Sequence, residues 1–439
     1  MKKIYLDYAA TTPVDPLVLK AMLPYFKEKF GNPGSLHSYG QEAIAAVDDS
    51  REKIARSIGA EFREIIFTGS ATEVNNLALR GIVEGFNNTY NLTPRIIVSS
   101  IEHESILETC RDMERDGVEI IYLPVDKFGV VNLKKLEESL NERTILVSIM
   151  YANNEIGAIQ PIAEISKIIN EFKKEKKNPS PKPSQPSKHG PSLLIPRSGT
   201  PTVARRGQAS ESLDERSGLR EGIFFSGYPL FHTDAVQAFQ FLNCNVNDLG
   251  VDLMTLSAHK IYGPKGIGAL YTSNLKPNTY NLKPIITGGG QEFGFRSGTE
   301  NVALIAGFAK AMELANKNRQ KESKRIFKLA NYFWKELKKI YPKVKLNGPT
   351  NNKKLPNILN IQFPSQNADD LLMKLDLSGI AASSGSACSS RAMRPSCVLK
   401  ATGLSDKSIK NSLRFSFGKF TAKSEIDLTL KILVKIFKS

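Results

Sequence analysis

Residues 251–266 read VDLMTLSAHKIYGPKG, an apolar run followed by a small-residue and lysine motif and then a turn rich in glycine and proline. The apolar run predicts a buried strand, so Lys260 lies where that strand gives way to the turn. A lysine in a loop is ordinarily solvated. Schiff-base chemistry instead needs an amine that is held rigidly and whose pKa burial and nearby charge can adjust. Because several other unusual stretches fit the same site, we interpret Lys260 as a reactive lysine.

Composition places the chain among ordinary globular proteins. Of its 439 residues, 41% are hydrophobic and 24% are charged, which is typical of such proteins. No apolar run reaches the roughly 18 residues that span a bilayer, and residues 1–7 lack the features of a signal peptide. We therefore expect a cytoplasmic protein without a membrane partner. The four cysteines form no CxxC pair, so we expect reduced thiols and not a disulfide framework.

The net charge of +16 is concentrated partly in one segment. Residues 173–221 hold eleven Lys/Arg against five Asp/Glu, a net +6, and seven of the 23 prolines lie between positions 179 and 201. This composition buries too little apolar surface to fold alone, so residues 178–222 are predicted to be a disordered surface insertion. A basic docking arm stays open as the alternative. Elsewhere the basic residues are dispersed, and we do not expect nucleic-acid binding.

Strands and helices alternate along the first half of the chain. Apolar runs at 64–68, 95–99 and 144–150 predict buried strands, and each ends at a cluster of polar residues. The first strand runs through the small-residue turn 69–73 into a helix, an arrangement that presents free backbone N–H groups to a phosphate. The alternation predicts an α/β fold with a mostly parallel sheet and a ligand at its carboxyl edge.

The second half adds further elements of both kinds. Residues 232–237 are predicted to be another polar strand end, and a long helix is expected from 302 to about 337. Strand-like segments at 357–361 and 412–416 then indicate a smaller α+β domain.

Taken together, residues 5–13, 257–266 and 383–390 closely resemble a fold-type I pyridoxal-phosphate enzyme, and more narrowly a cysteine desulfurase of the NifS/IscS type, group I. The resemblance covers nearly the whole chain apart from the insertion. It implies a large domain, 15–318, with a mostly parallel seven-stranded sheet flanked by helices. It also implies a small domain made of 1–14 and 319–439, and a homodimer.

The resemblance assigns the cofactor-binding residues. Lys260 would form the Schiff base with pyridoxal 5'-phosphate and act as general base and acid. Donors to the cofactor phosphate would come from the first turn of the helix after residue 70 and from the lysine motif, with one residue crossing the subunit interface. These implied phosphate ligands are Ala71, Thr72, Ser257, His259 and Thr299. A dianionic phosphate favours a helix N-terminus and several donors.

Four further positions match residues around the cofactor ring and the substrate. Asp234 would keep the pyridine nitrogen protonated, and its alternative role is a helix N-cap. His103 would stack on the ring, unless it is a satisfied structural histidine. Gln237 would bond the phenolic oxygen, and Asn154 would hold the cofactor and the substrate carboxylate.

Arg414 and Cys388 complete the implied site. Arg414 matches the arginine that binds the substrate carboxylate, with a surface ion pair as its alternative. Cys388 lies among Ser, Gly and Ala, where a mobile thiol can take sulfur from L-cysteine as a persulfide and pass it on. The alternative is a buried structural cysteine. Cys397 is either a resolving thiol or a small buried side chain.

The implied reaction converts L-cysteine to L-alanine and supplies sulfur to an acceptor protein such as an iron–sulfur scaffold. Three alternatives stay open: a selenocysteine lyase, a small-amino-acid aminotransferase, and a non-catalytic desulfurase-like subunit. No two histidines have ligand spacing such as HxxxH, so no metal site is expected.

Overall fold

The computed structural model describes residues 3–87, 92–177, 227–273, 282–350, 353–385 and 395–438. The predicted insertion 178–222 and Cys388 lie outside the described residues. Within the described residues, the two main cores of buried side chains form around a large sheet, on both of its faces, and around smaller sheets. A small additional cluster includes Ile101, Met150 and Leu399.

The large sheet has seven strands in the order β2-β8-β7-β6-β5-β3-β4. Strand β8 is antiparallel to both of its neighbours, and the other strands run parallel to one another. Every residue of β5 to β8 is buried, as expected for strands covered on both faces. The prediction of a mostly parallel seven-stranded sheet is therefore confirmed. The strands are β2 (Ile65–Thr68), β3 (Arg95–Ser99), β4 (Glu119–Leu123), β5 (Thr144–Ser148), β6 (Leu230–Asp234), β7 (Leu253–Ser257) and β8 (Gly268–Thr272).

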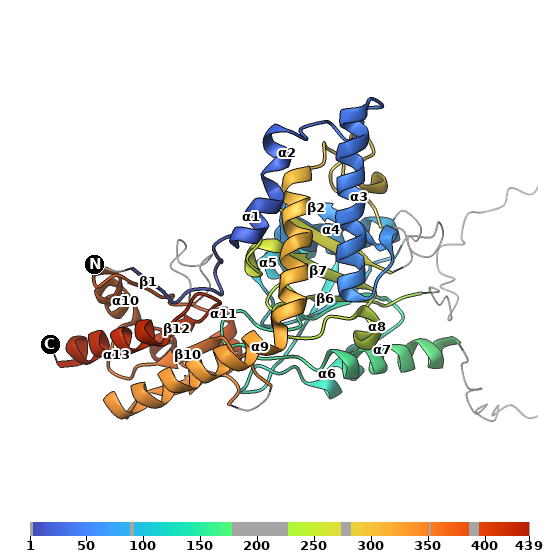
Figure 1. Ribbon diagram of the computed structural model, residues 1–439. Coiled ribbons are helices and arrows are strands. Elements are labelled where there is room, and N and C mark those ends of the chain that lie inside the picture. Colours follow the sequence, from blue (N-terminus) through green and yellow to red (C-terminus); the bar gives the residue numbers. More distant parts are fainter. Residues whose placement is uncertain are drawn as a thin grey trace, which may run out of the picture.

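Helices cover both faces of this sheet, because alternate strand residues point to opposite sides. Helices α4 (Ala71–Asn87) and α5 (Glu104–Arg115) pack with Ile66, Ile96 and Val98. On the other face, α1, α3, α7 and α9 pack with Phe67, Ile97 and neighbouring side chains. Figure 1 shows α3 and α9 running side by side. The helices of this second group are α1 (Pro16–Met22), α3 (Ser38–Ile58), α7 (Ile162–Lys177) and α9 (Val302–Ile340), and the shorter α2 (Pro24–Lys27), α6 (Leu133–Ser139) and α8 (Val246–Leu249) lie nearby in the chain.

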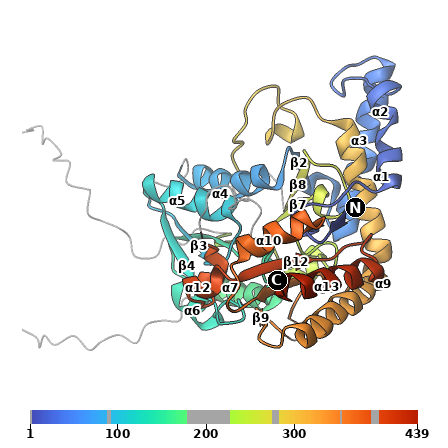
Figure 2. The same cartoon turned by 90° about the vertical axis from the view of Figure 1, so that its left-hand side faces the viewer.

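The second core lies between two small sheets and three helices. Strand β1 (Ile4–Tyr5) pairs in parallel with β11 (Ile380–Ala381), and the antiparallel sheet β12-β10-β9 lies beside α10 and α13. Figure 2 shows α10, β12 and α13 next to one another. The elements are β9 (Lys345–Asn347), β10 (Ile358–Gln362), β12 (Ser412–Ser416), α10 (Ala368–Leu377) and α13 (Lys423–Lys438), with α11 (Cys397–Ala401) and α12 (Asp406–Ile409) between β11 and β12.

Helix α9 contributes side chains to both cores. Its first half, up to Ala315, packs in the large core, and Ile326 to Leu337 pack in the small one. The division into 15–318 and 1–14 with 319–439 stays a prediction, and the separation of the two cores along α9 supports it. Near the N-terminus, α1 and α2 are separate helices that divide at Pro24, because proline lacks the N–H that would continue α1.

Candidate active site

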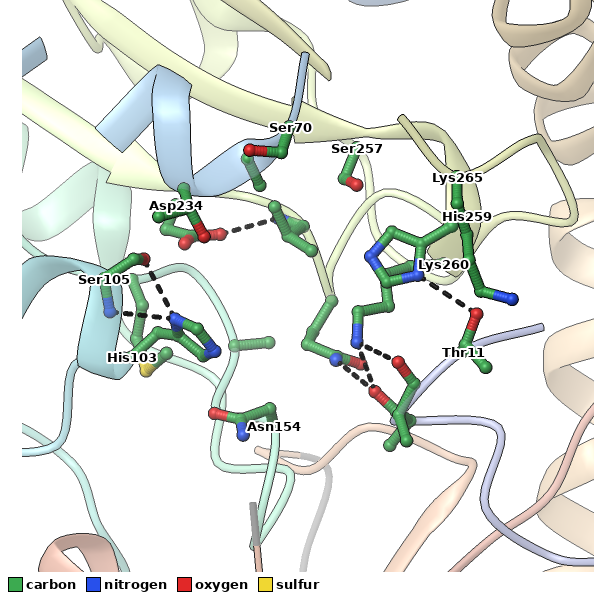
Figure 3. Close-up of a pocket in the computed structure, with 18 of the residues that line it drawn as sticks. Thr11, Ser70, His103, Ser105, Asn154, Asp234, Ser257, His259, Lys260 and Lys265 are labelled. Carbon is green, nitrogen blue, oxygen red and sulfur yellow. Dashed lines mark hydrogen bonds between the residues drawn. The ribbon is translucent and has the colours of Figure 1, made fainter. Parts of the chain in front are cut away.

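A cavity of about 370 Å³ lies at the carboxyl ends of β5, β6 and β7. It gathers side chains from seven separate stretches of sequence, and Figure 3 shows most of them converging from different elements. Ten of the residues singled out in the sequence line this one cavity: Ala71, Thr72, His103, Asn154, Asp234, Gln237, Ser257, His259, Lys260 and Arg414.

Lys260 ends a short 3-10 helix, Ala258–Lys260, that directly follows β7. Its Nζ donates to the carbonyl oxygens of Ala9, at 2.7 Å, and of Ala10, at 2.6 Å. The side-chain amide of Gln237 donates to the same Ala9 oxygen at 2.9 Å. The amine is therefore held at a fixed position by backbone carbonyls of the N-terminal segment, and it faces the cavity (Figure 3).

One end of the cavity is lined by hydrogen-bond donors. The hydroxyl of Ser257 is buried and has no hydrogen-bond partner among the described residues. Ala71 and Thr72 begin the 17-residue helix α4, where the first N–H groups have no intrahelical partner. Gly268 makes room for this turn, since a Cβ there would lie 2.9 Å from the carbonyl carbon of Ser70. An unpaired buried hydroxyl beside a helix N-terminus is a donor set that fits a phosphate.

His259 lies beside these donors and contacts the N-terminal segment. Its Nδ1 is 3.1 Å from the hydroxyl of Thr11. Burial, with the charge of Lys260 as the next cause, lowers the pKa of His259 to about 3. The ring is therefore neutral, and it retains one N–H as a donor.

Asp234 ends β6 on the side of the cavity remote from His259 (Figure 3). One carboxylate oxygen accepts from the backbone N–H of Val236 at 2.9 Å, which is the capping role considered for it. The other oxygen accepts from the amide nitrogen of Asn75 at 3.0 Å. The carboxylate thus caps the following turn and also lines the cavity, so both roles weighed from the sequence are compatible.

His103 is the N-cap of α5 and lines the cavity as well. Its Nδ1 accepts from the backbone N–H of Ser105 at 3.1 Å and lies 2.9 Å from the Ser105 hydroxyl. Burial, followed by the charge of Lys260, lowers the pKa of His103, although Asp234 opposes this. The imidazole is therefore a neutral group whose other nitrogen faces the cavity (Figure 3).

Arg414 is only 1% exposed and is committed to two partners. One terminal nitrogen donates to the carbonyl of Asn154 at 2.9 Å, and the other donates to the carboxylate of Asp7 at 2.8 Å. Its Nε is buried without a partner among the described residues. The ion pair considered from the sequence exists, but it is buried at the cavity and not on the surface.

Two residues singled out from the sequence lie elsewhere. Thr299 is exposed, and it lines a separate hollow together with Phe26 and Phe30. Cys397 is half-buried in a second cavity of about 400 Å³, which shares His103 with the first. Burial, followed by the charge of Glu155, raises the pKa of Cys397 to about 11. The protonated thiol is unlike the low-pKa thiolate that a resolving cysteine needs.

Sequence reasoning assigned no role to Asn75, Thr255 or Asp7, all of which contact site residues. Asn75 carried a usable signal, because it is an amide on the face of α4 that otherwise buries Val74, Leu77 and Ala78. A buried amide on an apolar helix face needs specific partners. Asp7 had no comparable signal, since its partner Arg414 lies 407 residues away.

Two further observations concern membrane-spanning helices and metal-binding groups. Throughout the described ranges, no helix is both long enough and apolar enough to cross a membrane. Within the same ranges, His, Cys, Asp and Glu do not gather in groups of three that could hold a metal ion.

Comparison with known proteins gives consistent matches along the chain. The family model described as aminotransferase class-V matches residues 4–175 and 228–429. A cysteine desulfurase IscS of Dictyoglomus turgidum is 41% identical over 437 residues, covering 100% of this chain and 95% of that protein. The cysteine desulfurase IscS of Rickettsia massiliae is 38% identical, covering 98% of this chain and 90% of that protein. A solved NifS-like protein superposes with a TM-score of 0.80 at 33% identity, covering all of both chains. The solved structure of SspA in complex with cysteine superposes with a TM-score of 0.72 at 31% identity, covering 96% of this chain and 100% of that chain.

Proposed function

Because the chain belongs to the aminotransferase class-V family, we propose that it is a pyridoxal-phosphate-dependent cysteine desulfurase that converts L-cysteine to L-alanine. Full-length identity of about 40% to IscS desulfurases supports this function. The observation that carries the proposal is that the amine of Lys260, the carboxylate of Asp234 and the unpaired hydroxyl of Ser257 line one and the same cavity.

The residues present fit pyridoxal phosphate. Ser257 and the first turn of α4 would bind the phosphate, and Asp234 would pair with the pyridine nitrogen. When bound, the cofactor supplies a carbonyl for the substrate amine and a ring that accepts electrons from the reacting carbon. Lys260 would then leave the Ala9 and Ala10 carbonyls and move the proton at the substrate Cα.

The substrate carboxylate would bind beside Arg414 and Asn154, where the guanidinium already lines the cavity. Sulfur transfer would use the thiolate of Cys388. Its sulfur forms a bond to the substrate Sγ, while the Cβ–Sγ bond breaks and its electron pair stays with Cβ, which takes up a proton. The products are L-alanine and a persulfide on Cys388, so atoms and electrons balance.

We also infer a homodimer in which Thr299 binds the cofactor phosphate of the other subunit. The exposed apolar side chains of the α1–α2 region and the following loop support this inference, because exposed apolar groups of this size mark interaction surfaces. Phe26 is 61% exposed and Phe30 is 67% exposed, and both border the same hollow as Thr299. A cytoplasmic sulfur-acceptor protein, such as an iron–sulfur scaffold, would take the persulfide sulfur.

The test compares Cys388→Ser with the matched control Cys397→Ser. Purified proteins are given L-cysteine and a reductant, and alanine and sulfide are assayed together with the absorbance spectrum. We expect Cys388→Ser to keep the cofactor band and to lose both products, and Cys397→Ser to behave like the unmodified enzyme. Full sulfide production by Cys388→Ser would overturn the assignment of the nucleophile. A wild-type protein that binds cofactor but forms no alanine would overturn the proposed function.

A further inference from the structure

A continuous row of buried polar side chains runs beneath the cavity from β5 to α5. Each neighbouring pair is within hydrogen-bond distance, from 2.7 to 2.9 Å. Four members of the row, from Ser148 to Asn75, are fully buried, and the last two are partly buried. The row consists of Ser148, His232, Thr255, Asn75, Ser105 and His103.

The direction of each hydrogen bond follows from the amide of Asn75. Its Oδ1 can only accept, so Thr255 donates its hydroxyl proton to it, at 2.7 Å. The hydroxyl of Thr255 must then accept from Nε2 of His232, at 2.9 Å. Burial lowers the pKa of His232 to about 3, so its ring is neutral and Nδ1 accepts from Ser148. One arrangement of protons therefore satisfies this half of the row.

The other half of the row leads to the site. The two N–H groups of Asn75 go to Asp234 Oδ2, at 3.0 Å, and to the hydroxyl oxygen of Ser105, at 2.8 Å. That hydroxyl is left with its own proton to donate to Nδ1 of His103, which also accepts the backbone N–H of Ser105. With two donors on Nδ1, the proton of the neutral imidazole is on Nε2, the nitrogen that faces the cavity (Figure 3).

The charge of Asp234 fixes this arrangement. If the amide of Asn75 were turned over, its oxygen would face the Asp234 carboxylate and two acceptors would meet in a buried setting, which is unfavourable. The amide therefore keeps its N–H groups toward Asp234, and the second N–H then orients Ser105. In this way one buried amide connects the carboxylate to the imidazole.

We propose that Asn75 is a positioning residue that couples Asp234 to His103, by directing the Ser105 hydroxyl onto Nδ1 so that His103 presents an N–H at Nε2 to the substrate. The proposal rests on the proposed function. A neutral N–H donor can stabilise negative charge on the substrate without placing a second cation beside Lys260. Its expected consequence is that His103 stays neutral through the working pH range.

Several charged groups face His103 and must be considered together. Asp234 and Glu104 favour its protonation, and Lys260 opposes it. The adjoining second cavity is also lined by charged side chains, namely Glu102, Glu108, Arg111, Arg115 and Glu155. These groups stay the same in the variants below, so a change in the protonation midpoint of His103 comes from the substituted side chain.

The first experiment replaces the donor with an acceptor of the same shape, in Asn75→Asp. Asn76→Asp is the matched control, because it adds the same charge one position along α4, where the side chain bonds Thr72 and Arg80. The chain has five histidines, so the ring nitrogens of ¹⁵N-histidine-labelled holoenzyme can be followed by NMR against pH, with His103→Gln identifying the His103 signals. In parallel, the acid limb of kcat/KM is measured.

We expect His103 of the unmodified enzyme to carry its proton on Nε2. Asn75→Asp should raise the midpoint of its protonation by about one pH unit, and the acid limb of kcat/KM should move by the same amount. Asn76→Asp should leave both midpoints within a few tenths of a unit. An unchanged His103 tautomer and midpoint in Asn75→Asp would overturn the proposal.

A second variant separates the hydroxyl route from direct electrostatic attraction between the new charge and the protonated imidazole. Ser105→Ala removes the hydroxyl donor but keeps the backbone N–H on Nδ1. If Asn75 acts through Ser105, the midpoint shifts of Asn75→Asp and Ser105→Ala are less than additive in the double variant. Strict additivity would overturn the route through the hydroxyl. The NMR measurement needs no turnover, so its failure is distinguishable from an enzyme that makes no alanine.

Discussion

The buried ion pair between Arg414 and Asp7 gives a prediction that can be worked from the structure. The guanidinium is 1% exposed on its side chain and the carboxylate 14%, and their atoms lie 2.8 Å apart. Asp7→Asn keeps the shape of the side chain but removes its charge. Arg414 is then left as a buried cation whose other hydrogen-bond partner is the Asn154 carbonyl.

Removing one partner of a buried ion pair costs about 3–5 kcal/mol, because the remaining charge is uncompensated. For a domain of this size, that cost corresponds to a fall in Tm of roughly 5–15 °C. The matched control is Asp49→Asn. Asp49 pairs with Lys53 at 2.5 Å, but both side chains are more than half exposed. Exposed pairs contribute at most about 1 kcal/mol, so this control should change Tm by no more than about 3 °C.

The same variant also tests whether Arg414 binds the substrate carboxylate. In Asp7→Asn, the carboxylate of L-alanine would supply the missing anion, so L-alanine should bind at least tenfold more tightly, which is about 1.4 kcal/mol. Thermal unfolding of the holoenzyme is followed with increasing L-alanine. Unfolding of Asp7→Asn at the wild-type temperature, with no stronger response to L-alanine than the wild type, would refute the reasoning.

Three further predictions concern single positions. Borohydride reduction of the unmodified enzyme should attach the cofactor covalently to Lys260, which mass spectrometry of the peptide that contains Lys260 can detect. Lys260→Ala should lose this label, and a label on any other lysine would contradict the assignment. Ser257→Ala should weaken pyridoxal phosphate binding about 10- to 100-fold, the range for hydrogen bonds to charged groups, as measured by titration with the cofactor. The protein without cofactor should be no less stable to urea, because the hydroxyl that is lost has no hydrogen-bond partner there among the described residues. Burial raises the pKa of Glu102 to about 8 from an ordinary value of 4.5. Between these two pH values the folded state keeps a proton that the unfolded state loses. The free energy of unfolding should therefore fall by about 3–5 kcal/mol as the pH rises from about 4.5 to 8. Glu102→Gln should remove that fall, and an unchanged pH dependence of the urea midpoint would show that Glu102 does not titrate in this window.

The sequence predicted those parts of the site that come from local patterns. Apolar runs that end in polar clusters placed Asp234, Asn154 and Lys260 at strand ends, and parallel strands bring such ends to one edge of a sheet. The antiparallel strand β8 was not predicted, because its buried residues carry no signal of direction. The family resemblance added the expected roles of residues such as His103 and Gln237, which the spacing of residues alone does not indicate.

Contacts between distant parts of the chain could not be predicted in the same way. Asn75 lies 159 residues from Asp234 and 180 from Thr255, yet its one amide contacts both. Such a network depends on the relative placement of three elements within a few tenths of an ångström, which hydrophobic periodicity does not determine. The position of Thr299 outside the cavity of its own chain likewise becomes clear only from the folded structure.

The N-terminal segment, residues 4–12, connects the small sheets to Lys260 in one short path. Ile4 and Tyr5 pair with β11, Asp7 binds Arg414, and the carbonyls two and three residues later hold Lys260. A rotation of the small sheets would therefore pull directly on the hydrogen bonds of the Lys260 amine. Movement of the Lys260 amine away from these carbonyls and movement of the small sheets are thus mechanically linked, and shortening this segment would disturb the two together.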